Sequence, residues 1–344
     1  MLFRVLKPAK RQRWRSLPSR GQVTLILTRR RSALRRKPPA RWTLGERTPR
    51  VLKAKLKLPA ARAPAQIQPQ KIPIAGQSKE MTVSDTEGAA QENQLLTTAR
   101  TRPVFGTFVI EFFSPGLPTL LKQAGADWVL FDLEHSGFGL DAARAPIAVA
   151  RQTGITAVVR VPGPHQHLVS TALDAGADAI MVPWVESAAD AKRIASWIKY
   201  PPLGVRGSAF GIAGDQYVGG PAEAAQRAAD ARTFFLPQIE TPGAVEEVDA
   251  IAALPGVDVP FVGPLDLSTN LGVPGDFTAP AVERALERVL EACAAHSKVP
   301  GIFAPTIELA CRWSDMGFRM VSLAADTALL SWAFADGLEA IRKG

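Results

Sequence analysis

The stretch "WVLFDLEHSGF" (residues 128–138) joins a short apolar run to three titratable residues. Residues 128–131 have the composition of a buried strand, because aromatic and β-branched side chains suit a pleated, covered surface. Asp132, Glu134 and His135 follow within four positions. The stretch therefore predicts a buried strand that carries titratable side chains at its carboxyl end.

The same pattern recurs along the chain from residue 104, where short β-rich runs alternate with helix-like segments such as 279–296. Thr241-Pro242 also reads as a helix start, with an N-cap followed by proline. The alternation predicts βα units around a parallel sheet. The eight expected strands are 104–110, 128–132, 156–161, 179–183, 233–240, 259–263, 300–304 and 319–323.

Eight strands in about 240 residues predict a (β/α)8 TIM barrel, which keeps its polar chemistry at the carboxyl ends of the strands. A doubly wound open sheet is the alternative. Its phosphate-binding G-x-G-x-x-G turn between the first strand and helix is absent from the sequence.

The N-terminal part of the chain differs sharply in charge from the rest. Residues 1–100 contain 23 Lys and Arg against 5 Asp and Glu, a net charge of +18, whereas residues 101–344 contain 18 against 27, a net charge of −9. The first 45 residues have no acidic side chain. We therefore expect a basic, disordered leader and linker over 1–100 and the barrel domain over 101–344.

Three interpretations of the leader remain open: an organelle transit peptide, a nucleic-acid-binding arm, or translated sequence upstream of a true start at Met81. Composition favours the last, since transit peptides are usually shorter and richer in serine. The expected location is the cytoplasm, or an organelle if the leader is a transit peptide. No apolar run reaches the roughly 18 to 20 residues of a membrane helix, so a membrane role is not expected.

Two carboxylates are candidate metal ligands. Strand alternation puts Gln238 and Glu240 on one face, and Asp266 stands just past the next strand. Carboxylates on neighbouring strand ends can hold a divalent cation and leave positions open for water and substrate. Alternatively, Glu240 could stabilise the start of the helix at Pro242, and Asp266 could cap a short helix.

Arg160 and His135 are the other candidates for chemistry. Arg160 ends the third strand, where a guanidinium can bind a carboxylate or a developing oxyanion; a structural ion pair inside the barrel is the alternative. His135 beside Asp132 and Glu134 suits a general base, although a lone histidine is more often structural. No lysine from residue 101 onward ends an expected strand, so metal-assisted chemistry is preferred to a Schiff base.

Taken together, six ordered motifs resemble the HpcH/HpaI aldolase/citrate lyase family of metal-dependent 2-keto acid aldolases. They are "FDLEH" (131–135), "VVRVP" (158–162), "ALDAGADAIMVP" (172–183), "YPPLGVRG" (200–207), "PQIET" (237–241) and "GPLDLS" (263–268).

The resemblance implies a role for each matching residue. Glu240 and Asp266 would bind the metal, Mg²⁺, Mn²⁺ or Co²⁺, and Arg160 would contact the keto oxygen of bound pyruvate. His135 would be the catalytic base with Asp132 as its partner. Gln238 and the backbone around Leu265 would help to seat the substrate carboxylate, and Asp174 would reach a neighbouring subunit of a homo-oligomer, typically a hexamer. Two departures, Leu133 where glycine is commoner and Leu265 where a small residue is usual, bear on the shape of the aldehyde pocket.

The expected activity is reversible cleavage of a 4-hydroxy-2-keto acid to pyruvate and an aldehyde. One alternative is cleavage of an acyl-CoA of the malyl-CoA or citryl-CoA type. A second is a nucleic-acid-binding protein with an inactive barrel, which the acidic residues 101–344 and the few aromatic residues of the leader disfavour.

Overall fold

The computed structural model describes residues 93–343 of the 344-residue chain. The predictions for the leader up to residue 92, including a start at Met81, concern residues outside those described. No helix within residues 93–343 is long and apolar enough to cross a membrane.

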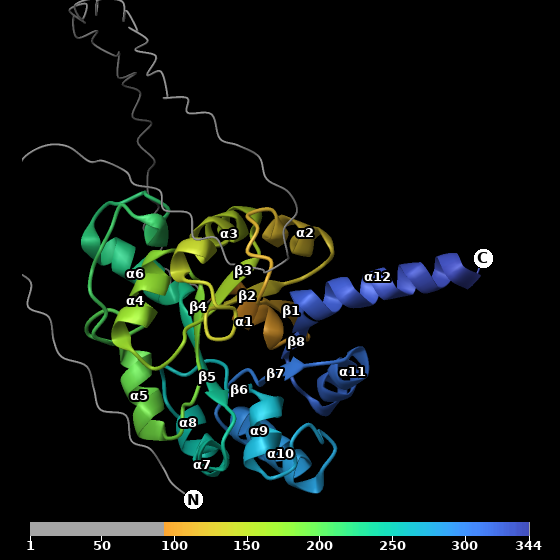
Figure 1. Cartoon of the computed structure of the whole chain (residues 1–344). Helices are drawn as coiled ribbons and strands as arrows, with labels where there is room; N and C mark the ends of the chain where they lie inside the picture. Colours follow the sequence, from red (N-terminus) through yellow and green to blue (C-terminus); the bar gives the residue numbers. More distant parts are fainter. Residues whose placement is uncertain (1–92, 344) are drawn as a thin grey trace, which may run out of the picture. The chain divides into compact units, whose positions relative to one another are not determined.

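Eight parallel strands close into a barrel in the order β1 to β8 (Figure 1), which confirms the TIM-barrel prediction. Each strand pairs with its neighbours in the sequence, and β8 closes on β1. The strands are β1 (Val104–Val109), β2 (Trp128–Asp132), β3 (Thr156–Arg160), β4 (Ala179–Val182), β5 (Phe234–Ile239), β6 (Phe261–Val262), β7 (Gly301–Ala304) and β8 (Met320–Ala325).

Helices connect the strands and cover the outside of the barrel (Figure 1). In chain order they are α1 (Gln94–Ala99), α2 (Leu117–Gln123), α3 (Leu140–Thr153), α4 (Gln166–Asp174), α5 (Ala188–Ser196), the 3-10 turn η1 (Ala213–Asp215), α6 (Ala222–Arg232), α7 (Pro242–Glu246), α8 (Val248–Ala252), α9 (Pro264–Asn270), α10 (Pro280–Ala295), α11 (Ile307–Met316) and α12 (Asp326–Lys343). The predicted helix start at Thr241 is confirmed, since its side chain accepts a hydrogen bond from the Ala244 N–H.

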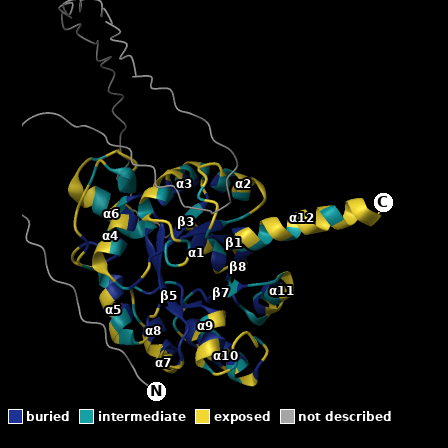
Figure 2. Cartoon of the chain, in the orientation of Figure 1, coloured by how far each residue is buried: buried dark blue, intermediate teal, exposed yellow. Residues whose placement is uncertain are grey.

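The apolar residues form two layers, one inside the barrel and one between the strands and the helices. In Figure 2 the buried residues are concentrated in the strands of the barrel. Strand alternation sorts them: in β2, Trp128 and Leu130 belong to the inner layer, and Val129 and Phe131 to the outer one. The same alternation carries Asp132, at the end of β2, onto the inner row. The barrel interior is therefore apolar in its middle and polar at its carboxyl end.

Trp128 fills the barrel interior because β1 has a glycine beside it. A Cβ on Gly106 would lie 2.3 Å from the Trp128 ring and 2.4 Å from its carbonyl oxygen. Gly106 is also the register partner of Trp128. Only glycine allows this indole to lie across the neighbouring strand.

Helix α1 belongs to the folded unit, although the sequence analysis assigned residues up to 100 to a disordered leader. Asn93 caps the helix by accepting a hydrogen bond from the Leu95 N–H, and Leu95, Leu96 and Ala99 are buried in the inner apolar layer. Over residues 94–99 the structure thus differs from the expectation. The physical reason is that three apolar side chains at helical spacing cover the amino end of the barrel.

We expect Leu96→Ala to lower the free energy of unfolding by about 2–4 kcal/mol, because it removes a buried side chain that is 3% exposed. Gln94→Ala, an exposed change on the same helix, is the control and should change it by less than about 0.5 kcal/mol. Urea denaturation followed by circular dichroism measures both. Equal, small effects would mean that α1 contributes nothing to the barrel.

Candidate active site at the carboxyl end of the barrel

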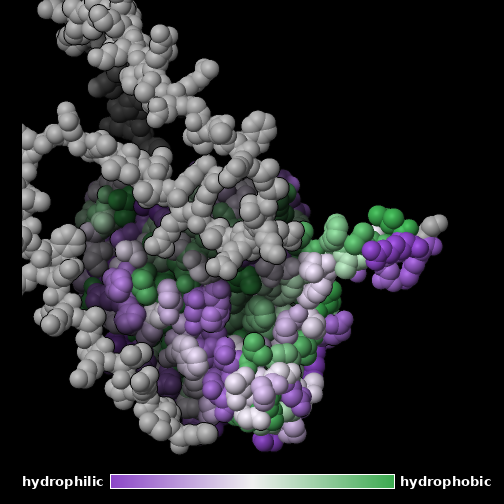
Figure 3. Space-filling view, in the orientation of Figure 1, coloured by the Kyte–Doolittle hydropathy of each residue, from purple (hydrophilic) through white to green (hydrophobic). Residues whose placement is uncertain are grey.

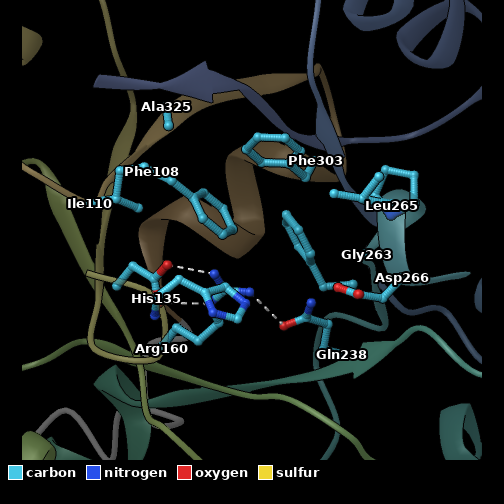
Figure 4. Close-up of a pocket in the computed structure, with 13 residues that line it drawn as sticks. Phe108, Ile110, His135, Arg160, Gln238, Gly263, Leu265, Asp266, Phe303 and Ala325 are labelled. Atoms are coloured by element: carbon cyan, nitrogen blue, oxygen red, sulfur yellow. Dashed lines mark hydrogen bonds and ion pairs between the residues drawn. The ribbon is translucent and has the colours of Figure 1, made fainter. Parts of the chain in front are cut away.

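A cavity of about 290 Å³ opens at the carboxyl end of the strands (Figure 4). It contains the predicted residues Asp132, His135, Arg160, Gln238, Leu265 and Asp266 among its lining. Glu240 is 1% exposed and does not line the cavity, but it is hydrogen-bonded to Gln238, which does. Seven of the eight predicted site residues therefore lie together, and Asp174 lies elsewhere.

Arg160 and Asp132 form a buried, two-pronged ion pair. The Arg160 Nε donates to Asp132 Oδ1 at 2.9 Å and its Nη2 donates to Oδ2 at 2.5 Å. Burial acts to lower the pKa of Arg160, but the hydrogen bond to Asp132 and the charges of Asp132 and Glu134 raise that pKa overall. The two residues are register partners on adjacent strands, so the barrel itself sets the pair.

Nη1 of Arg160 faces two further side chains. It donates to Gln238 Oε1 at 3.4 Å and lies 3.2 Å from Glu134 Oε2. The second contact has the distance of an ion pair but not the geometry of a hydrogen bond, so this buried oxygen keeps an open acceptor position. Burial raises the pKa of Glu134 against the opposing charges of Arg160 and His135.

Glu240 is held by two donors from neighbouring elements. Its Oε1 accepts from the Trp184 backbone N–H at 2.7 Å and its Oε2 accepts from Gln238 Nε2 at 2.5 Å. Trp184 lies two residues after the end of β4 and has a φ of 56°, a left-handed conformation that a bulky residue adopts only when the surroundings enforce it. The sequence analysis predicted neither hydrogen bond, because each depends on which donor lies beside Glu240 at the rim: a backbone N–H from Trp184 and a side-chain amide from Gln238.

Gly263 leaves the space that the Glu240 carboxylate occupies. A Cβ at this position would lie 2.6 Å from Gln238 Nε2 and 2.9 Å from Glu240 Oε2. Gly263 directly follows β6 and is the N-cap residue of α9, which carries Asp266 in its first turn. The lack of a Cβ at Gly263 therefore leaves room for the side chains of Gln238 and Glu240.

Burial raises the pKa of Glu240 to about 7, and the negative charges of Asp266 and Glu134 contribute to the rise. The carboxylates of Asp132, Glu134 and Glu240 thus act on the Arg160 guanidinium, and Asp266 adds a fourth negative charge near Glu240 and Glu134. Such excess negative charge and an unused buried carboxylate oxygen fit a divalent cation with oxygen ligands.

Glu240 and Asp266 would be only part of the coordination shell of the ion. Within residues 93–343 no group of three or more His, Cys, Asp or Glu side chains could hold an ion by itself. Glu240 and Asp266 would leave several positions of a six-coordinate ion to water or substrate, as Mg²⁺-like ions in enzymes usually require.

His135 lies at the edge of the cavity with its side chain 61% exposed. Its Nε2 is 3.7 Å from Glu134 Oε2, and its backbone N–H donates to Asp132 Oδ1 at 3.4 Å. Asp132 therefore reaches the His135 backbone, and Glu134 is the carboxylate beside the ring. The pairing of the Asp132 side chain with the imidazole stays a prediction.

Asp174 ends α4 and is paired with Arg206, whose Nη2 donates to Asp174 Oδ1 at 3.0 Å. Arg206 is buried and lies over the Tyr200 ring, 4.8 Å from its centroid. The loop of residues 200–207 thus fixes Asp174 away from the cavity of its own chain. The predicted contact of Asp174 with a neighbouring subunit stays a prediction.

Comparison with known proteins agrees with this geometry. The model of the HpcH/HpaI aldolase/citrate lyase family matches residues 107–333. The chain belongs to this family. That membership confirms the resemblance seen in the sequence, and the match extends from within β1 into α12, so it covers all of the barrel strands except residues 104–106.

Individual relatives share about a third of their residues with the chain. It is 35% identical to a hydroxypyruvate/pyruvate aldolase of Paraburkholderia phytofirmans, a match that covers 70% of this chain and 94% of that protein. It is 33% identical to a 4-hydroxy-2-oxovalerate aldolase of Novosphingobium aromaticivorans, over 73% of this chain and 95% of the relative.

A solved structure is similar as well. The crystal structure of a HpcH/HpaI aldolase/citrate lyase family protein from Burkholderia cenocepacia has a TM-score of 0.68 and 32% sequence identity, and covers 73% of this chain and 99% of its own.

We expect Asp132→Ala to lower the free energy of unfolding by about 3–5 kcal/mol, because it leaves the buried Arg160 charge without its main partner. His135→Ala removes a mostly exposed ring and should change that free energy by less than about 0.5 kcal/mol. Urea denaturation with a chelator present measures both. An equal decrease in the free energy of unfolding for both variants would contradict the conclusion that Asp132 is paired with Arg160 while the His135 ring is mostly exposed.

A second prediction follows from the raised pKa of Glu240. The ordinary pKa of a glutamate side chain is 4.5, and burial raises that of Glu240 to about 7. Between these two pH values the unfolded chain has released a proton that the folded protein keeps, so unfolding becomes more favourable as the pH rises. Relative to Glu240→Gln, the metal-free wild type should lose stability on the order of 3 kcal/mol across that window and then remain constant. Thermal unfolding at a series of pH values tests this, with the exposed Glu287→Gln as control. If the free energy of unfolding differed between Glu240→Gln and wild type by the same amount at every pH, the raised pKa of Glu240 would be contradicted.

Proposed function

We propose that the protein is a carbon–carbon lyase, a metal-dependent aldolase that cleaves a 4-hydroxy-2-keto acid reversibly to pyruvate and an aldehyde. The observation that carries the proposal is the grouping of Arg160, Gln238, Asp266 and His135 around one cavity at the barrel rim, with Glu240 hydrogen-bonded to Gln238. The aldolase names of relatives that match most of the barrel support the same class of reaction.

The ion we propose is Mg²⁺, Mn²⁺ or Co²⁺, held by Glu240 and Asp266. When bound, it supplies positive charge at the carboxylate and 2-keto oxygen of the substrate. Gln238 supports this arrangement because its amide bridges Arg160 and Glu240. The side chain is thereby held in one orientation before substrate arrives.

Arg160 acts on the same 2-keto oxygen. Its Nε and Nη2 are committed to Asp132, which leaves Nη1 as the nitrogen directed towards Gln238 and the cavity. A fixed donor of this kind lowers the energy of negative charge that develops on an oxygen, and its removal typically costs on the order of 10²–10³ in rate.

His135 removes the proton of the C4 hydroxyl group. The C4–O bond becomes a carbonyl as the C3–C4 bond breaks, and the electron pair of that bond moves into the pyruvate half and onto its 2-keto oxygen. A proton then returns to C3 to give pyruvate. The exposure of the ring and the nearby Glu134 carboxylate support this role, because an imidazolium formed in the step would face a negative charge.

The relatives do not agree on the group that leaves as the aldehyde. Their names include 4-hydroxy-2-oxovalerate, with a methyl group at C4, and 5-keto-4-deoxy-D-glucarate, a sugar-derived dicarboxylate. The comparison therefore supports pyruvate as one product of the reaction. The identity of the aldehyde has to be inferred from the cavity of this chain. No specific feature of the described residues favours the acyl-CoA or nucleic-acid alternatives.

Glu240→Ala should abolish pyruvate release that depends on added divalent metal, with wild-type secondary structure retained. Pyruvate is measured by coupled reduction with lactate dehydrogenase, on protein treated with chelator and then reloaded with Mg²⁺, Mn²⁺ or Co²⁺. Glu287→Ala on the outer helix α10 is the matched control and should keep full activity. If pyruvate release by Glu240→Ala still depended on added metal as in the wild type, Glu240 would not be a metal ligand.

We also propose that the protein is a homo-oligomer, with a hexamer as the expected form. Helix α12 supports this: it runs away from the barrel, and only its first residue, Asp326, is buried (Figures 1 and 2). Leu330, Phe334 and Ile341 are 57%, 67% and 77% exposed, and apolar side chains mark the helix in Figure 3. An 18-residue helix with such a surface is more stable when a second copy covers it.

Leu330→Glu combined with Phe334→Glu should therefore reduce the oligomer to smaller species, while the barrel retains its circular dichroism spectrum. Sedimentation velocity measures the mass. Thr327→Glu, an exposed change at the start of the same helix, is the control. A wild-type protein that sediments as a monomer would contradict the proposal.

A further inference from the structure

The wall of the site cavity is divided into a polar and an apolar half (Figure 4). The polar half comes from the ends of β2, β3 and β5 and from the first turn of α9. The apolar half comes mainly from β7, β8 and β1, which are neighbours in the barrel, and it faces Arg160 and Gln238 across the opening. Its members are Phe108, Ile110, Leu265, Phe303 and Ala325, which we call the apolar wall.

Aromatic contacts hold the apolar wall in place. The rings of Phe108 and Phe303 meet edge to face with their centroids 5.0 Å apart, and Phe108 also lies 6.1 Å from the Phe261 ring in the barrel interior. Phe108 is buried, whereas Phe303 is half-buried and Leu265 is 59% exposed above it. Phe108 is thus held in place by its neighbours, whereas Phe303 and Leu265 are the accessible residues of the apolar wall.

No residue of the apolar wall carries a charge that could pair with a charged group of the substrate. Among the described residues, Arg160 is the only Lys or Arg that lines the cavity. Its Nε and Nη2 are paired with Asp132, and the proposed function assigns its Nη1 to the 2-keto oxygen, so no nitrogen of this guanidinium is left for a second carboxylate. The Arg160 guanidinium carbon also lies over the Phe108 ring, 5.1 Å from its centroid, on the polar side of the cavity. His135 is on that side too, beside Glu134.

The proposed reaction fixes the direction of the substrate in this cavity. The carboxylate and 2-keto oxygen must lie at Glu240, Asp266 and Arg160, so C3, C4 and the group on C4 extend away from them. Phe108, Ile110, Phe303 and Ala325 of the apolar wall lie across the cavity from Arg160 and Gln238, and Leu265 lies beside Asp266. The group on C4 therefore meets hydrocarbon side chains.

We propose that the C4 group, which leaves as part of the aldehyde, is an uncharged hydrocarbon group, so that the enzyme produces an aliphatic or aromatic aldehyde in preference to a carboxylated one. This inference rests on the proposed function. A second carboxylate at this position would lose its water against Phe108 and Phe303 and find no cation in exchange. A hydrocarbon group instead gains from burial against the same rings.

The sharpest test compares two substrates of nearly the same shape that share the pyruvate half. One is 4-hydroxy-2-oxoheptanedioate, which yields the carboxylated 4-oxobutanoate. The other is 4-hydroxy-7-methyl-2-oxooctanoate, in which an isopropyl group replaces the distal carboxylate and the product is 4-methylpentanal. We expect kcat/KM for the methyl-branched substrate to be at least about 10²-fold higher, because the charged group must be desolvated without a partner.

A variant reverses the preference by adding the missing cation. Leu265→Arg places a guanidinium at an exposed position of the apolar wall, and it should raise kcat/KM of the carboxylated substrate relative to its isostere by at least about tenfold. Leu120→Arg is the matched control on the outer helix α2, where Leu120 is 63% exposed, and it should leave the ratio unchanged. Phe303→Leu should lower kcat/KM of the methyl-branched substrate more than that of 4-hydroxy-2-oxopentanoate, whose methyl group is too short to need the ring.

One measurement separates this inference from the proposed function. Metal-dependent exchange of the C3 hydrogens of pyruvate in deuterated water reports the chemistry of the pyruvate half without any aldehyde. Exchange together with a preference for the carboxylated substrate would overturn the inference and leave the aldolase in place. If neither exchange nor cleavage occurred, the proposed function and the inference would both be overturned.

Discussion

The buried ion pair between Asp132 and Arg160 is the interaction on which the site depends. Its two residues stand opposite each other at the ends of β2 and β3, and both side chains are at least nine-tenths buried. An arginine in this position is costly to bury alone, so the pair holds the strand ends and the guanidinium in one arrangement. Nη1 of Arg160 then orients Gln238, and Gln238 orients Glu240.

This chain of contacts gives one arginine two tasks that are usually discussed separately. Its Nε and Nη2 neutralise Asp132, and the proposed function assigns its Nη1 to the 2-keto oxygen of the substrate. The alternative of a structural ion pair and the prediction of a catalytic donor are therefore compatible. Excess negative charge remains around Glu134, Glu240 and Asp266, and it is this excess that a divalent cation would balance.

The division of the cavity has its origin in the order of strands around the barrel. Polar residues end β2, β3 and β5, whereas the inward positions at the top of β7, β8 and β1 are hydrocarbon. In the proposed reaction, the polar residues would act on the pyruvate half and the hydrocarbon residues would bind the leaving group, so the two tasks would depend mainly on different strands. Asp326 adds order to the apolar side: its carboxylate accepts from the backbone N–H groups of Ile110, Glu111 and Phe112, and so fixes the loop after β1.

The sequence by itself determined the barrel, its eight strands and most of the site. Strand alternation is a local property, and it was enough to direct Asp132, Arg160, Gln238 and Glu240 inward at the carboxyl ends. The tertiary structure alone decided the partners: Asp132 with Arg160, the Trp184 N–H with Glu240, Asp174 with Arg206. It also placed α1 within the folded unit. These contacts join residues distant in sequence, so their geometry arises only when the barrel closes and brings the strand ends together.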